Sequence, residues 1–155
     1  FDALAAASIA CVSDFKPQNI ANTVWAFATA GHTSPALFGA LAAASAKLVG
    51  DFKPQELANT AWAFATVSHA SPLLFDALAA ASIACVSDFK PQNIANTVWA
   101  FATAGHTSPA LFGALAAASA KLVGDFKPQE LANTAWAFAT VSHASPLLFD
   151  ALAAA

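Results

Sequence analysis

Four histidines recur once every 37 residues, and histidine is a common side chain for proton transfer and metal binding. They are His32, His69, His106 and His143. Helices pack about 10 Å apart whereas Zn–N bonds are about 2 Å long, so histidines of neighbouring repeats cannot share an ion. No Cys, Asp or Glu lies within a few positions of His32. We therefore expect each imidazole to bond helix-terminal carbonyls in a loop, and we expect no metal site.

Asn–Thr pairs recur at the same interval and are the strongest candidates for a ligand-binding face. At helical spacing they lie opposite the apolar stripe of their segment. Two interpretations stay open, namely a ladder of carboxamides that bond one another and fix the stacking of repeats, or a polar face that binds a ligand. The candidate residues are Asn22, Thr23, Asn59, Thr60, Asn96, Thr97, Asn133 and Thr134.

Tryptophan also recurs once per repeat, with phenylalanine two positions later. Such a stripe can stack nucleobases, but its position beside Leu and Val favours core packing. The four residues are Trp25, Trp62, Trp99 and Trp136. The two cysteines, Cys11 and Cys85, are two repeats apart, about 20 Å at helix-packing distances, which excludes a disulfide between them. We expect each to be a buried small apolar residue.

The composition disfavours several classes of function. No Ser or Thr hydroxyl is accompanied by a His–acid pair, so we expect neither an enzyme nor a cofactor. The six basic residues are all lysines and the net charge is −3, which disfavours binding to nucleic-acid phosphates. Apolar residues make up 58% of the chain, yet polar residues and prolines interrupt every run before the roughly 18 to 20 residues of a membrane span.

Internal repetition dominates the organisation of the chain. Residues 1–81 are identical to residues 75–155, and each 74-residue unit contains two repeat types that agree at 25 of 37 positions. We expect a single array with a partial second helix at 1–14, full repeats at 15–51, 52–88 and 89–125, and a truncated repeat at 126–155.

Each repeat is expected to form two helices, about Pro17–Ala30 and Pro35–Val49 in the first full repeat. Proline suits the first helical position, Ser34 is a good N-cap, and Gly31 and Gly50 are expected to close the two helices. Linkers of about four residues make the helices antiparallel neighbours. The sequence therefore predicts an all-α fold, an α-solenoid of antiparallel helix pairs.

The repeated segment KPQ(N/E)(I/L)ANT(V/A)WAFAT, followed by SP(A/L)LF and an alanine-rich helix, resembles the octotricopeptide repeats of organellar proteins that also carry RAP domains. The resemblance covers essentially the whole chain, at one residue less than the usual 38. It implies an α-solenoid and, in that family, often RNA binding in organelles.

Neither end of the array carries a polar cap, and only about 10% of residues are charged. We therefore expect a window on a longer array or a head-to-tail assembly, and a structural solenoid that stacks end to end into a fibre. The alternatives are an octotricopeptide-type module that binds single-stranded RNA, and a designed consensus repeat protein. The expected partners are copies of the chain or further repeats, with RNA disfavoured by charge, and no compartment is indicated.

Overall fold

The computed structural model describes residues 1–69, 71–141 and 153–154, and it contains only helices and turns in that part of the chain. The α-helices are α1 (Asp2–Cys11), α2 (Pro17–Thr29), α3 (Pro35–Leu48), α4 (Pro54–Thr66), α5 (Pro72–Ala84), α6 (Pro91–Ala104), α7 (Pro109–Leu122) and α8 (Pro128–Thr140). Short 3-10 helices join the repeats at η1 (Val12–Asp14), η2 (Val49–Asp51), η3 (Val86–Asp88) and η4 (Val123–Asp125). The predicted all-α class is confirmed.

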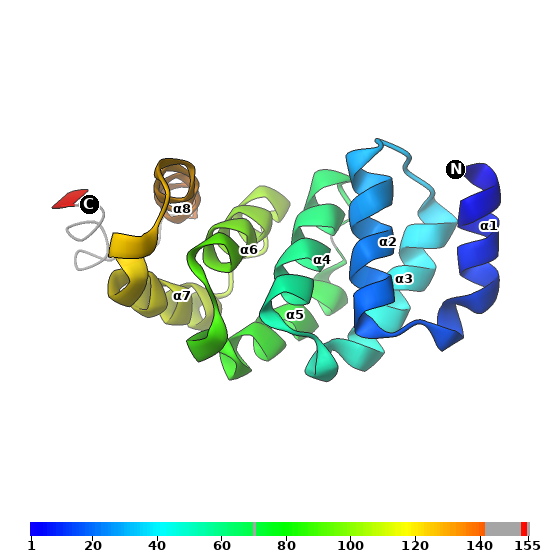
Figure 1. Cartoon of the computed structure of the whole chain (residues 1–155), viewed down its shortest axis with the longest axis horizontal. Helices are drawn as coiled ribbons and strands as arrows, with labels where there is room; N and C mark the ends of the chain where they lie inside the picture. The colour runs from blue at the N-terminus through cyan, green and yellow to red at the C-terminus, as the bar shows by residue number, and fades with distance from the viewer. Residues whose placement is uncertain (70, 142–152, 155) are drawn as a thin grey trace.

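The helices form two parallel rows. The A-row contains α2, α4, α6 and α8, each packed on the next, and the B-row contains α1, α3, α5 and α7 in the same order. Within a repeat the two helices also contact each other, as α2 does α3, α4 does α5 and α6 does α7. Figure 1 shows the array running from α1 at the right to α8 at the left. This arrangement is the predicted solenoid of helix pairs.

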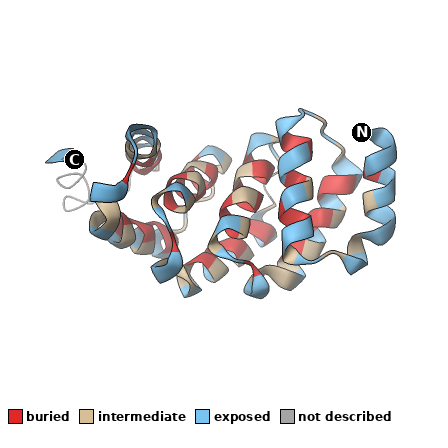
Figure 2. Ribbon diagram, in the orientation of Figure 1, coloured by how far each residue is buried: buried red, intermediate tan, exposed pale blue. Residues whose placement is uncertain are grey.

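The core lies between the two rows, where Figure 2 shows the buried residues. Ile20 and Val24 of α2 and Leu37 and Leu41 of α3 are fully buried, as their helical spacing predicts. Phenylalanine supplies the largest of the fully buried side chains. The fully buried phenylalanines are Phe38, Phe64, Phe75, Phe101, Phe112 and Phe138.

The predicted start and stop signals account for the helix ends. The Ser34 hydroxyl accepts a hydrogen bond from the Leu37 amide at 3.3 Å, and Gly31 adopts φ +70° just after α2. The two helices end one residue earlier than predicted. The role expected of Gly50 is wrong, because it lies inside the 3-10 helix η2 and does not adopt a left-handed conformation.

Across the described residues, none of the helices has both the length and the apolar character that crossing a membrane requires.

Candidate nucleic-acid interface

The A-row helices leave one narrow strip of their surface uncovered. On α2 this strip consists of Gln18, Asn22, Trp25 and Thr29, which lie at i, i+4, i+7 and i+11 and are all exposed. The equivalent positions of α4, α6 and α8 are exposed or half-buried. We call this strip, repeated on four adjacent helices, the A-face. It presents carboxamides, hydroxyls and indole rings on the side of the A-row that faces away from the B-row.

The threonines of the Asn–Thr pairs do not lie on the A-face, contrary to the sequence expectation. Thr60, Thr97 and Thr134 are completely or almost completely buried, and only Thr23, on the first A-row helix, is half-buried. The reason is that a helix in the row is covered by its A-row neighbours as well as by the B-row. The hydroxyls of the three buried threonines have no hydrogen-bond partner among the described residues.

The asparagines lie at the edge of the A-face. Asn22 is exposed, and Asn59, Asn96 and Asn133 are half-buried. No side-chain hydrogen bond joins these carboxamides to one another or to other groups in the part of the chain that the structure describes. The structure therefore shows no carboxamide ladder there, and it leaves the donors and acceptors of these side chains available to a ligand.

The expectation that the tryptophans pack in the core is wrong for the two outer repeats. Trp25 is 46% exposed and Trp136 is 49% exposed. Trp62 and Trp99 are half-buried and face each other across α4 and α6, with ring centroids 6.4 Å apart and planes 30° from parallel. Their position on the helix is the edge of the A-face nearest the core stripe, and periodicity alone does not decide whether a residue at such an edge is buried.

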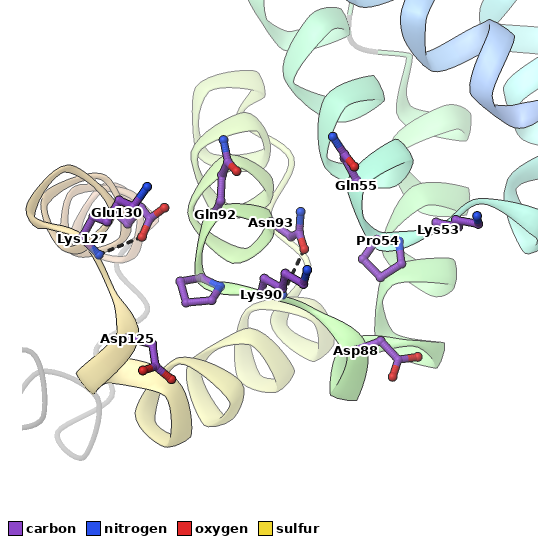
Figure 3. Close-up of a pocket in the computed structure, with 11 residues that line it drawn as sticks. Lys53, Pro54, Gln55, Asp88, Lys90, Gln92, Asn93, Asp125, Lys127 and Glu130 are labelled. Atoms are coloured by element: carbon purple, nitrogen blue, oxygen red, sulfur yellow. Dashed lines mark hydrogen bonds between the residues drawn. The ribbon is translucent and has the colours of Figure 1, made fainter.

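A groove of about 440 Å³ runs across the N-terminal ends of α4, α6 and α8. Each of these helices begins with Pro-Gln and has a lysine as its N-cap, and Figure 3 shows Lys53, Lys90 and Lys127 around the groove together with Asp88 and Asp125. Helix N-termini carry partial positive charge, which adds to that of the lysines. Sequence reasoning missed this groove, although the recurring lysine before the first helical proline was a signal for it.

Capping boxes fix the first turn of the helices that form the groove. The backbone N–H of Lys90 donates to the Asn93 side chain at 3.0 Å, and that of Lys127 donates to Glu130 at 2.8 Å. The two repeat types therefore differ in charge here, because the first type caps with a neutral carboxamide and the second with a carboxylate. Lys90, in a first-type repeat, therefore has no carboxylate in its own capping box, whereas Lys127 has that of Glu130.

The rings of His32, His69 and His106 do not bond helix-terminal carbonyls, contrary to the expectation, and His143 lies outside the described residues. The Nε2 atom of His106 lies 2.9 Å from Asp76 of α5, and that of His32 lies 3.2 Å from Asp2 of α1. For His69, the residue equivalent to Asp76 is Gly39, which has no carboxylate. The His69 ring packs against Phe38 and Phe64 instead. Among the described residues no group of three metal-ligating side chains comes together.

The cysteines are free, but the burial expected of them is only partly observed. Cys11 is exposed, and Cys85 is half-buried with its Sγ 3.3 Å from the Ala81 carbonyl. Burial, and secondly the nearby Asp88 carboxylate, raise the pKa of the Cys85 thiol. The thiol is therefore a weaker nucleophile at neutral pH than an ordinary cysteine.

Comparison with models of known protein families identifies the family of the chain. Residues 1–154 match the family model described as RNA-editing substrate-binding complex 6 protein. The chain belongs to this family. No curated protein matches the chain.

Membership of the RNA-editing substrate-binding complex 6 family confirms the sequence resemblance only at its coarser level, that of a helical-repeat protein. The match covers every A-row helix from α2 to α8, so the whole A-face lies within the region shared with the family.

Proposed function

We propose that this helical-repeat chain binds single-stranded RNA on its A-face and works within an RNA-processing complex. The observation that carries the proposal is the repetition of the same uncovered Gln, Asn, Trp and Thr positions on four adjacent helices. The family's printed description, an RNA-editing substrate-binding complex protein, supports RNA as the ligand and a multi-protein complex as the setting. The likeness to octotricopeptide repeats supports the same proposal.

The chemistry of the A-face suits single strands better than duplexes. Unpaired bases offer their faces to aromatic rings and their edges to carboxamides, which both donate and accept hydrogen bonds. With six lysines and a net charge of −3, phosphate attraction is a minor contribution. The proposed role is therefore binding by stacking and hydrogen bonding, without catalysis.

The proposal is tested by titrating the chain with a fluorescently labelled 20-nucleotide RNA of mixed sequence at low salt. We expect saturable binding that weakens when Asn22, Asn59 and Asn96 are together replaced by alanine. The control variant is Thr107→Ala, an exposed loop position outside the A-face, which should bind like the parent. If the parent chain shows no binding to single-stranded RNA, the proposed function is wrong.

Stacking of copies end to end, as in a fibre, is a second proposal, and the surface of α1 favours it. Phe1 and Leu4 are 55% and 60% exposed, whereas the equivalent Phe75 and Leu78 are fully buried inside the array. Such a surface fits the face of a further repeat, whether it belongs to the same chain or to another copy. Sedimentation velocity over a range of concentrations tests this, and a monomer at every concentration would exclude self-stacking.

A further inference from the structure

The contact between α4 and α6 differs from the other contacts of the A-row. The indole rings of Trp62 and Trp99 face each other across it with centroids 6.4 Å apart. No ring contact joins Trp25 to Trp62 or Trp99 to Trp136 in the described ranges, and both outer rings are about half exposed. The α4–α6 contact joins a second-type repeat to a first-type repeat, so this ring pair is expected once per 74-residue unit.

We propose that Trp62 and Trp99 form a clamp that takes one unpaired nucleobase between their rings, a site that rests on the proposed RNA-binding function. The 6.4 Å separates ring centroids and lies within the range of direct aromatic pairs, so the slot between the two rings is closed in the free chain. A base that enters the slot replaces this one contact between the rings by a stacking contact with each of them.

Polar groups that could recognise a base edge lie beside the slot. Asn59 and Asn96 precede Trp62 and Trp99 by three residues, so each carboxamide lies on the same helix face as its indole ring. Neither carboxamide has a hydrogen-bond partner within the described part of the chain. Asparagine can donate to and accept from one base, as it does with adenine. The ligand class is thus a flat heterocycle with hydrogen-bonding edges, in a strand that exposes one such base to each two-repeat unit.

The decisive experiment compares an ordinary single-stranded RNA with an oligonucleotide of the same length in which every base is removed. Affinities are measured for the parent chain and for Trp62→Leu, Trp99→Leu and the double variant. We expect each single variant to bind the ordinary RNA about tenfold more weakly, the worth of one base–aromatic stack, and the double variant to lose little more. A base held between both rings loses its site when either ring is removed. The abasic strand should not distinguish the parent from the variants.

The outcomes separate the clamp from the general function. If the parent binds RNA but neither variant changes the affinity, the clamp is wrong and the proposed function stands; if the parent does not bind RNA at all, both are wrong. Two independent losses that add in the double variant would also overturn the clamp. Adenosine monophosphate serves as a further arm, since comparable affinity for it would identify a free-nucleotide site.

Should a leucine variant unfold, the fluorescence of Trp62 and Trp99 themselves decides the question. In a Trp25→Phe, Trp136→Phe background, where Trp62 and Trp99 are the remaining tryptophans, the indole emission should change on binding ordinary RNA, and the abasic strand should cause at most a small change. An equal change with both strands would contradict a base between the rings.

Discussion

Ser68 occupies a backbone conformation that two glycines occupy elsewhere in the chain. Its φ is +57°, and the equivalent Gly31 and Gly105 have φ +70° and +69°. The His69 amide donates to the Phe64 carbonyl at 2.9 Å, the hydrogen bond of a left-handed helix terminus. A side chain in this conformation is strained, because Cβ approaches the following carbonyl.

We therefore predict that Ser68→Gly stabilises the chain by about 0.5–1 kcal/mol, after the greater flexibility of glycine in the unfolded chain is deducted. The measurement is urea unfolding followed by circular dichroism. Ser68→Ala is the control and should give no gain, since it keeps the strained Cβ, while Gly31→Ala should lose about 1 kcal/mol. A destabilised Ser68→Gly variant would contradict the prediction.

The raised pKa of Cys85 gives a second prediction. Because burial and Asp88 favour the neutral thiol, the folded chain keeps this proton at a pH where the unfolded chain loses it. The contribution of this thiol to the free energy of unfolding is thus fully present below pH about 9, the ordinary pKa of a cysteine, and it decreases as the pH rises above that value. In a Cys11→Ser background, we expect a maleimide to react with Cys85 several-fold more slowly at pH 8 than with an unstructured cysteine peptide.

Asp88→Asn is the matched variant for this measurement. It removes one of the two causes of the raised pKa and should increase the rate of labelling at pH 8. A rate equal to that of the peptide in the original chain would show that Cys85 is not protected.

The tryptophans and threonines show what sequence reasoning at this scale could not provide. A helical wheel separates a core side from an outer side, and it placed Ile20 and Val24 correctly. It does not show which flanks are covered by the preceding and following helices of the row. Thr97 was therefore expected outside and is buried, while Trp25 was expected inside and is half exposed.

At the scale of elements, a His–Asp contact joins α5 to the loop after α6. The equivalent contact between α3 and the loop after α4 is absent. Asp76 lies 2.9 Å from His106, whereas Gly39 leaves open space beside His69. A Cβ added at Gly39 would have no atom within 4 Å. The first repeat type thus lacks the carboxylate that the second type supplies.

We predict that Gly39→Asp creates a third His–Asp pair. Gly39→Asn is the control, because removing a glycine from a helix stabilises it by itself, by roughly 0.5–1 kcal/mol relative to Ala. The difference between the two variants in thermal unfolding should be at most about 1 kcal/mol in favour of Asp, as for other exposed pairs. If Asn stabilises as much as Asp, the carboxylate contributes nothing.

The elements themselves were largely predictable, because caps and prolines are local signals. Ser34, Pro35 and Gly31 determine where helices begin and end through contacts with their own neighbours in the sequence. The groove at the helix N-termini was not predicted. It is formed by α4, α6 and α8 together, and no single repeat contains it.

At the scale of the whole molecule, the charge balance determines how RNA affinity depends on salt. Only three lysines line the groove, and Asp88, Asp125 and Glu130 lie among them. Each phosphate contact on a single strand contributes a slope of about −0.7 to the plot of log affinity against log salt concentration. We predict a slope no steeper than about −2, which Lys90→Gln makes shallower by about 0.7.

Lys47→Gln is the control for this titration, because Lys47 lies on α3 in the B-row, away from the A-face. Its slope should equal that of the parent chain. A parent slope of about −5 would place the main RNA contact outside the A-face and the groove.

The alternation of unlike contacts along the A-row also bears on how such a protein changes in evolution. Gain or loss of a single 37-residue repeat would place two repeats of one type side by side, at a contact for which neither face is shaped. Gain or loss of 74 residues preserves every contact. Selection on DNA copying errors would then retain changes in steps of two repeats, so related arrays should differ in length by whole pairs.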